Sequence, residues 1–246
     1  MEIPKDKKLD KAFYDKSKIA DDYYQIVGEN VESEKKITDS GISDYLKEIG
    51  LYNLRGKKVL DLGCGNGRWA EHFLNFDPEN VVGVDISEEM IKKANERKKQ
   101  DDAEKLEFIR GDQIDIPLAD NSMDVIFSRF SLCYAKDIEK AISEIKRVLK
   151  SGGELYVVTS FGIIREDSLA AELKDKPVPL LLGIGKEKVR LENYPHSLER
   201  YKKAFEAENL SIVNEQVFSA EDLFIPEDCP NRDKIKFDYV VFKVMK

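Results

Sequence analysis

The chain has 246 residues, 41% of them hydrophobic and 36% charged, which is enough to bury a substantial core and argues against wholesale disorder. Its net charge of −8 and the lack of a long basic block argue against a nucleic-acid partner, although a local basic groove stays compatible with the sequence. Its three cysteines are scattered without a C-x-x-C pair, so we expect neither a metal site nor a disulfide framework. The sequence has no signal-peptide pattern and no run of about 20 apolar residues, so we expect a cytoplasmic protein without a membrane partner.

Residues 1–55 are polar with a helical pattern, and we expect them to form an N-terminal lid that includes Tyr14, Tyr23 and Tyr24. From residue 56 to residue 160, short apolar runs alternate with helical patterns. Runs typical of parallel strands covered on both faces lie at 59–62, 81–85, 106–110, 124–127 and 155–158. Helices are expected over 68–75, after the capping residue Ser87, and over 138–149, where Gly152 and Gly153 would end the helix. This alternation predicts an α/β fold with right-handed crossovers.

The last third of the chain follows a different rhythm. Residues 161–200 contain Pro177, Pro179, Gly183 and Gly185, and we expect an irregular cap insertion there. A helix over 197–209 and strands over 210–218 and 238–244 would then complete the fold within 201–246. We therefore predict a single domain over residues 1–246, with a lid, a core at 56–160, the cap and a closing segment.

The turn after the first strand reads Gly63-Cys64-Gly65-Asn66-Gly67, and a helix follows it at once. Glycines let the chain bend sharply and bring backbone N–H groups close to a ligand, and the helix start adds partial positive charge. The spacing is G-x-G-x-G, whereas a dinucleotide-binding turn would need a third glycine where Arg68 stands. This departure argues against a nicotinamide oxidoreductase.

Asp85 ends the second strand, so its carboxylate is expected at the same edge of the sheet as the glycine turn. A carboxylate in this position can accept two hydrogen bonds from a ribose diol. The alternative role, capping the next helix, is already filled by Ser87. We therefore expect Asp85 to bind the ribose of a nucleoside ligand.

These features resemble those of the class I S-adenosylmethionine-dependent methyltransferases, especially the small-molecule group that includes enzymes of the ubiquinone and menaquinone pathways. The matching segments are residues 59–67, 82–87, 111–112, 118–126 and 144–153, so the resemblance covers about residues 57–160. It implies a Rossmann-like doubly wound sheet of seven strands, mostly parallel with an antiparallel closing strand, and helices on both faces. It also implies S-adenosylmethionine as cofactor.

The resemblance implies roles for individual positions. Asp61 would lie near the cofactor amino group, the turn from Gly63 to Gly67 along the methionine part, and Asp85 at the ribose. Asp112 and the Gln113 N–H would bind the adenine edge. The remaining implied contacts are Ile86 and Ile114 on the adenine ring, and Ser128, Arg129 and Phe130 beside the transferred methyl.

The acceptor is less defined by the sequence. The position after the fourth strand reads Ser128-Arg129-Phe130-Ser131 and lacks the [Asp/Asn]-Pro-Pro-[Tyr/Phe] segment of enzymes that methylate adenine or glutamine amides. With the acidic charge, this favours a small organic acceptor. His196 and Tyr134 are the candidates for a catalytic or substrate-contacting group, although a surface or capping role is favoured for His196. An RNA or protein methyltransferase, and a non-catalytic cofactor-binding protein, remain as alternatives.

Overall fold

The structure is a computed structural model, which describes residues 41–99, 104–164, 169, 173, 176–184, 187–219, 223–224, 229 and 232–246. Most of the expected lid, including Tyr14, Tyr23 and Tyr24, lies outside the described residues. The described end of that segment forms the short helix α3 (Ile42–Glu48), which buries Ile42 and Leu46.

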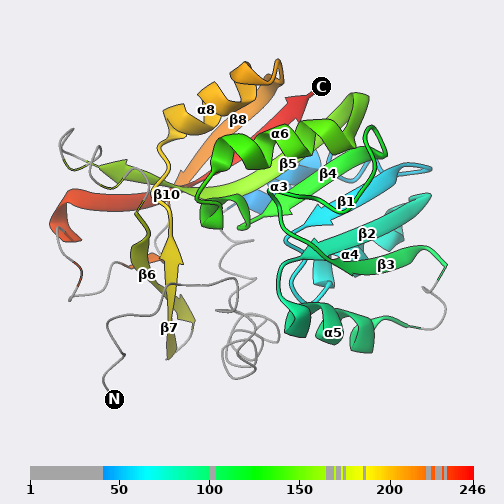
Figure 1. Ribbon diagram of the computed structural model, residues 1–246, viewed down its shortest axis with the longest axis horizontal. Coiled ribbons are helices and arrows are strands. Elements are labelled where there is room, and N and C mark those ends of the chain that lie inside the picture. The colour runs from blue at the N-terminus through cyan, green and yellow to red at the C-terminus, as the bar shows by residue number, and fades with distance from the viewer. Residues whose placement is uncertain are drawn as a thin grey trace.

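A seven-stranded sheet in the order β3-β2-β1-β4-β5-β10-β8 forms the centre of the molecule (Figure 1). Strand β10 runs antiparallel to both of its neighbours, and the other adjacent strands pair in parallel, which confirms the predicted fold class. The strands are β1 (Lys58–Leu62), β2 (Asn80–Asp85), β3 (Leu106–Arg110), β4 (Met123–Arg129), β5 (Leu149–Ile164), β8 (Ser211–Ser219) and β10 (Ile235–Met245).

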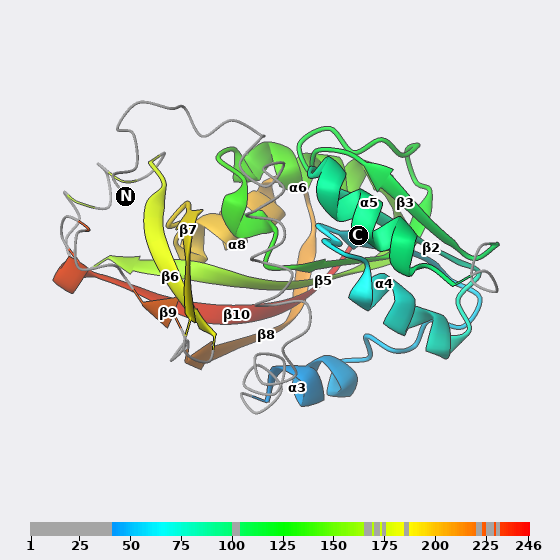
Figure 2. The same cartoon turned by 90° about the horizontal axis from the view of Figure 1, so that it is seen from below.

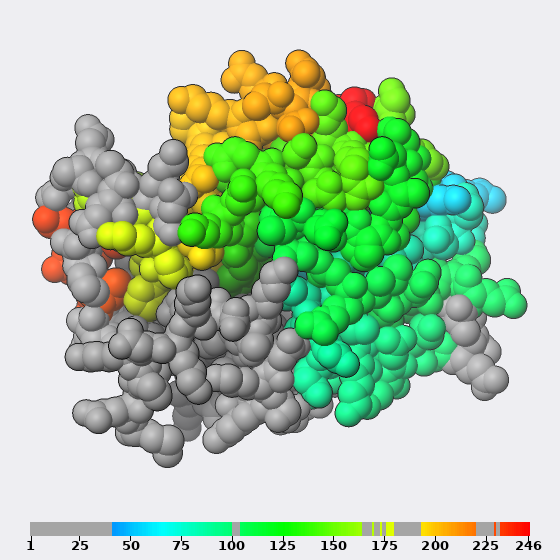
Figure 3. Space-filling view, viewed as in Figure 1, coloured from blue at the N-terminus to red at the C-terminus, as the bar shows by residue number. Residues whose placement is uncertain are grey.

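Helices cover both faces of this sheet, because its central strands are apolar on both sides (Figure 2). On one face lie α3, α4 (Arg68–Phe73), continued by the 3-10 turn η2 (Leu74–Phe76), and α5 (Glu88–Arg97). On the other face lie α6 (Ile138–Val148) and α8 (Leu198–Ala207), which form a continuous outer surface (Figure 3).

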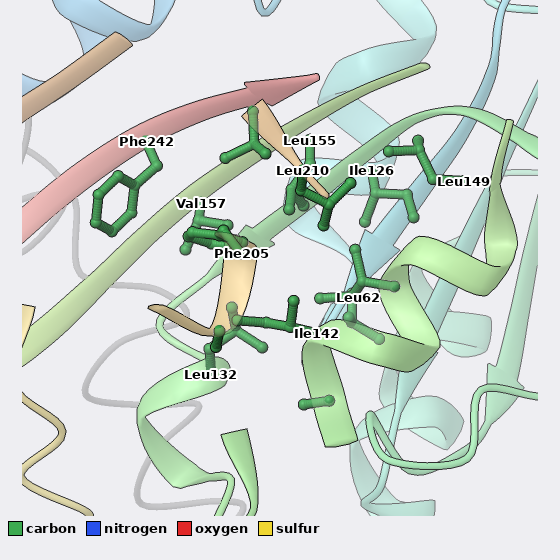
Figure 4. Packing of buried hydrophobic residues seen from close by; sticks show 14 of the residues in the cluster. Leu62, Ile126, Leu132, Ile142, Leu149, Leu155, Val157, Phe205, Leu210 and Phe242 are labelled. Atoms are coloured by element: carbon green, nitrogen blue, oxygen red, sulfur yellow. The ribbon is translucent and has the colours of Figure 1, made fainter. Parts of the chain in front are cut away.

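Helix α6 shows how the sequence pattern produces the packing. Its apolar residues recur three and four positions apart and are fully buried against β4 and β5 (Figure 4). Asp137 caps its start by accepting a hydrogen bond of 2.9 Å from the Lys140 N–H. The expected end at Gly152 and Gly153 is wrong: Leu149 is already extended and pairs with Met123, and Gly152, with φ at 75°, forms a bend within β5.

The segment expected to be an irregular cap contains regular structure instead. Strands β6 (Val178–Ile184) and β7 (Glu187–Asn193) pair as an antiparallel hairpin, and β6 also pairs with β9 (Leu223–Phe224) in a second sheet. The prolines suggested a loop, but Pro179 lies near the start of β6, outside the part that pairs with β9, where a missing N–H is tolerated. Among the described residues no helix is long and apolar enough to cross a membrane.

Candidate functional site

The turn after β1 is a tight bend whose three glycines all have a positive φ, 80° at Gly63, 52° at Gly65 and 82° at Gly67. At Gly67 a side chain is excluded, because a Cβ there would lie 2.4 Å from the ring of Phe108 on β3. At Gly65 none of the described residues lies within 4 Å of the Cβ position. The bend therefore packs on the sheet at its end and leaves room for a ligand over its middle.

Asp85 connects this bend to the carboxyl end of β2. Its Oδ2 accepts a hydrogen bond of 2.9 Å from the Gly65 N–H, and its Oδ1 accepts one of 2.9 Å from the Ser87 N–H. Ser87 caps α5 as predicted, since its hydroxyl accepts from the Met90 N–H at 3.3 Å. Asp85 thus faces the bend with both carboxylate oxygens at the carboxyl edge of the sheet.

Asp61, on β1 just before the bend, is a buried carboxylate. It is 2% exposed, and its Oδ2 has no hydrogen-bond partner among the described residues. Burial and then the charge of Asp85 raise the pKa of Asp61 to about 7, while the Ala70 N–H and the charge of Arg129 act in the opposite direction. Because an uncompensated buried carboxylate is costly, this position favours a ligand that brings a cation.

The loops after β1, β3 and β4 are held together at this edge by Gln113 and Ser131. The Gln113 amide donates to the Ser131 carbonyl at 3.3 Å and accepts from its hydroxyl at 3.1 Å. The Ser131 side chain fills the space beside Gly63, where a Cβ would come within 2.4 Å of it. Asp112 closes the β3 turn by accepting from the Ile114 N–H at 3.2 Å. These contacts fix the floor of the site before any ligand is bound.

The predicted apolar residues of the site lie at the same edge. Ile86 follows β2 and Ile114 follows β3, and both are half-buried, so each leaves apolar surface at the carboxyl edge of the sheet. Arg110 fastens the loop after β2 by donating to the Ile86 carbonyl at 3.2 Å. Asn66 is half-buried in the bend, whereas Cys64 is buried beneath it, where burial raises the pKa of its thiol.

The end of β4 combines a buried hydroxyl, a cation and a strained backbone. Ser128 is fully buried and its Oγ has no partner among the described residues. The Arg129 guanidinium lies 5.4 Å from the ring centroid of Trp69 and 5.2 Å from that of Phe130. Phe130 has a φ of 52°, uncommon for a bulky residue and typical of functional sites, and its ring packs 5.1 Å from that of Tyr239.

His196 is not a surface residue, which corrects the favoured prediction. It is 1% exposed, and its Nε2 lies 2.6 Å from the Ala135 carbonyl, to which it donates. Its Nδ1 accepts from Arg200 at 3.1 Å, and Arg200 forms a bidentate ion pair with Glu139 at 2.8 and 2.9 Å. With both ring nitrogens engaged in this way, His196 fastens the segment before α8 and is poorly placed to take a proton.

Tyr134, the second catalytic candidate, is half-buried in the 3-10 turn η4 (Leu132–Tyr134), and its N–H donates to the Ser131 carbonyl at 3.0 Å. It therefore lies in the loop after β4, beside the site. Among the described residues no three His, Cys, Asp or Glu side chains are grouped as metal ligands.

Several residues of this edge were not singled out from the sequence. Ser131 and Tyr239 belong to it through tertiary packing, and Asn193 and Ser160 through a hydrogen bond between distant segments. Trp69 carried a signal, as the single tryptophan of the chain and the second residue after the glycine bend.

The fold and the site define a class. A seven-stranded sheet with one reversed strand, a glycine bend after β1 and an acidic residue ending β2 are features of class I S-adenosylmethionine-dependent methyltransferases. Residues 60–157 match the family model described as a methyltransferase domain.

Comparisons with individual proteins agree with this assignment. The chain is 32% identical to sterol 24-C-methyltransferase ERG6B of Gibberella zeae over 61% of its length and 39% of that protein. It is 37% identical to demethylmenaquinone methyltransferase of Listeria welshimeri over 42% of its length and 45% of that protein. The chain thus spans less than half of these relatives.

The fold is also that of a solved structure from Galdieria sulphuraria, named as a proposed sarcosine dimethylglycine methyltransferase. The two superpose with a TM-score of 0.68 over 92% of this chain and 97% of that chain, at 18% sequence identity. At this level of identity the likeness concerns the fold alone.

Proposed function

We propose that this protein transfers a methyl group from S-adenosylmethionine to a small organic acceptor by in-line displacement. When bound, this cofactor supplies a methyl carbon that is activated by the positive charge of its sulfur. The observation that carries the proposal is the pair of carboxylates around the glycine bend, Asp61 with an unpartnered buried oxygen and Asp85 facing Gly65. A nucleoside that also bears an ammonium group matches this pair.

The residues present fit the cofactor on physical grounds. The unpartnered Oδ2 of Asp61 matches the ammonium group, and the open backbone at Gly65 accommodates the methionine chain. Asp85 would accept from the ribose hydroxyls, while Asp112 and the Gln113 N–H would bind the adenine edge between Ile86 and Ile114. Ser128, Arg129 and Phe130 would then lie beside the methyl group, with Gly63, Cys64, Asn66 and Gly67 forming the bend.

The task of this chain in catalysis would be alignment and exclusion of water. Fixing the reacting atoms in line can lower a barrier by roughly 7–11 kcal/mol in ideal cases. The loops joined by Gln113 and Ser131, and the strained Phe130, supply such a fixed frame. Residues 1–55, with 161–200 and the closing segment 201–246, would complete a single domain around the core at 56–160 and close the site.

A decisive experiment measures binding of S-adenosylhomocysteine by calorimetry. Asp85→Ala should weaken binding more than tenfold, because charged hydrogen bonds to the ribose are lost. Asp85 also supports Gly65, so the analogue S-(2′-deoxyadenosyl)homocysteine provides the control. This analogue should bind the wild type more weakly than S-adenosylhomocysteine does. To Asp85→Ala, the two ligands should bind with equal affinity. An equal loss with both ligands would assign Asp85 a structural role only.

The small acceptor is favoured over RNA or protein by the net charge of −8 and by relatives named for a sterol and for demethylmenaquinone. We also propose a cytoplasmic location, supported by three buried cysteines that form no disulfide. A non-catalytic cofactor-binding protein would bind S-adenosylmethionine without turnover of any acceptor.

A further inference from the structure

Asn193, the last residue of β7, is buried with half of its amide unsatisfied. It is 4% exposed, and its Nδ2 donates a hydrogen bond of 2.8 Å to the Ser160 hydroxyl. Its Oδ1 has no hydrogen-bond partner among the described residues. Burying a carbonyl oxygen without a donor costs free energy, so an unpaired amide oxygen in a native site calls for a ligand or another explanation.

The place of Ser160 connects Asn193 to the cofactor site. Ser160 lies on β5, two residues beyond Val158, the last β5 residue that pairs with β4. On its other side Ser160 pairs with Tyr239 of β10. The ring of Tyr239 packs 5.1 Å from Phe130, which follows β4 beside the expected methyl position. A series of contacts therefore connects the end of β4, beside the glycine bend, to Asn193 through Tyr239 and Ser160.

The segment that carries Asn193 is held firmly between two elements. The Tyr194 N–H donates to the Cys133 carbonyl of η4 at 3.0 Å, and the Gly162 N–H of β5 donates to the His196 carbonyl at 2.9 Å. His196 is itself fixed to Ala135, as described above. Figure 1 shows the hairpin below the outer ends of β5 and β10, on the side away from α8. The unpaired oxygen is thus a feature of a rigid segment.

The Cys133 thiol, which like Asn193 interacts with Ser160, is uncharged. Burial raises the pKa of the Cys133 thiol to about 11, partly offset by hydrogen bonds from Ser160 and Thr159, so the thiol is uncharged at neutral pH. Arg200 of α8, which donates to His196, is paired with Glu139. The Asn193 oxygen can only accept a hydrogen bond, so it matches a ligand that donates an O–H or N–H, and a carboxylate brings no such donor.

We propose that Asn193, supported by Ser160, is a specificity-determining residue at the polar end of the methyl-acceptor site, and that it binds a neutral acceptor through an O–H or N–H group. The inference deepens the proposed function and rests on it. Asn193 would select neutral acceptors that bear a hydroxyl or amine group. It would disfavour acceptors that bear a carboxylate, including zwitterions such as sarcosine.

The experiment uses the full chain and four probes: 1-naphthol and 1-naphthylamine, which carry a donor, 1-methoxynaphthalene, which does not, and zwitterionic sarcosine. Binding is measured by calorimetry with S-adenosylhomocysteine bound, and methyl transfer by its release from S-adenosylmethionine. We expect a donor-bearing probe to be bound and methylated. Asn193→Leu, of similar volume, should raise the KM for that probe at least tenfold and leave the affinity for S-adenosylhomocysteine within twofold.

The chain offers a matched control in Asn80→Leu. The Oδ1 of Asn80 is also buried without a partner among the described residues, but Asn80 starts β2 at the opposite end of the sheet. Asn80→Leu should keep the thermal midpoint or raise it, since it removes an unpaired buried oxygen, and Asn193→Leu should change it little, since it removes such an oxygen together with the hydrogen bond to Ser160. Only Asn193→Leu should change acceptor kinetics.

The outcomes separate this inference from the proposed function. If the wild type fails to bind S-adenosylhomocysteine, the proposed function fails. Suppose instead that the wild type binds S-adenosylhomocysteine. The assignment of Asn193 is then overturned if the protein uses sarcosine or 1-methoxynaphthalene equally well as the donor-bearing probes, or if it uses neither donor-bearing probe. A KM unchanged in Asn193→Leu, or changed equally in Asn80→Leu, overturns it too.

Discussion

Asp61 has a protonation state that depends on what binds above it. Its folded pKa of about 7 lies above the ordinary aspartate value of 3.8, because burial and Asp85 disfavour the charge. The folded chain therefore keeps this proton between about pH 4 and pH 7 while the unfolded chain releases it. In that window the free energy of unfolding falls as pH rises. The destabilisation caused by the buried Asp61 charge is absent below pH 4 and complete above pH 7.

A cofactor ammonium beside Asp61 would reverse this balance by favouring the ionised carboxylate. At pH 7 we expect S-adenosylhomocysteine to release up to about half a proton on binding, since about half of the Asp61 carboxyls are protonated in the unliganded protein. Calorimetry in phosphate and in Tris, which differ in ionisation enthalpy, should give different binding heats. Asp61→Asn should bind more weakly and lose this buffer dependence. Identical heats in both buffers for the wild type would contradict the assignment.

The same residues show how far the sequence predicts the site. Asp61, the glycine bend and Asp85 follow one another along the chain, and their roles depend on local spacing that a motif records. Ser131 and Tyr239 enter the site through packing on Gly63 and Phe130, and their side chains have no distinctive spacing. Residues placed by contacts between distant segments could not be predicted from one sequence.

At the scale of elements, α6 does more than cover the sheet. The Arg147 guanidinium donates to the carbonyls of Leu118 at 2.7 Å and Ile116 at 2.8 Å, and Glu144 accepts from the Ile116 N–H at 2.9 Å. Arg147 also pairs with Asp120 and Glu144, both at 2.8 Å. The helix thereby holds the loop after β3, on which the adenine-binding candidates lie.

Removing this clamp should loosen the loop. Arg147→Met leaves two carbonyls without their donor and is expected to cost roughly 1–3 kcal/mol of stability. It should also speed amide exchange in residues 112–120 and weaken S-adenosylhomocysteine binding several-fold. The control is Arg55→Met, because Arg55 is 90% exposed and its pair with Asp77 is a surface contact worth less than about 1 kcal/mol. Equal losses in the two variants would show that Arg147 is an ordinary surface arginine.

The prediction of helices and strands succeeded where the apolar residues follow one clear pattern. It failed where prolines and glycines suggested a loop. All seven strands of the main sheet were placed, because most of them are apolar runs bounded by turns or helices. The hairpin of β6 and β7 was missed, since Pro177, Pro179 and Gly183 suggested a loop although Val178 to Leu182 is largely apolar. The length of β5 and β10 was underestimated, because their outer halves are stabilised by pairing with each other, from Glu154 with Met245 to Ile164 with Ile235.

At the scale of the molecule, this long strand pair joins two cores. Its inner half contributes Val157 and Phe242 to the large core beneath α6 and α8. Its outer half contributes Ile235 and Phe237 to a small cluster with Val178 at the start of the hairpin. The cofactor edge contributes Leu62 and Val84 to the large core and Cys64 to the core on the other face of the sheet, whereas the hairpin that carries Asn193 is anchored on the small cluster. The two binding functions therefore depend on different parts of the same strand.

Two phenylalanines of β10, five residues apart, test this division. Phe242 is fully buried in the large core and Phe237 is 4% exposed in the small one. Phe242→Ala should destabilise the whole fold by about 3–5 kcal/mol and lower amide protection throughout the main sheet. Phe237→Ala should lower protection in β6, β7 and the outer half of β5, raise the acceptor KM and leave S-adenosylhomocysteine affinity within twofold. If both variants lower protection of β1 and β4 equally, the two cores unfold as one unit and the division is wrong.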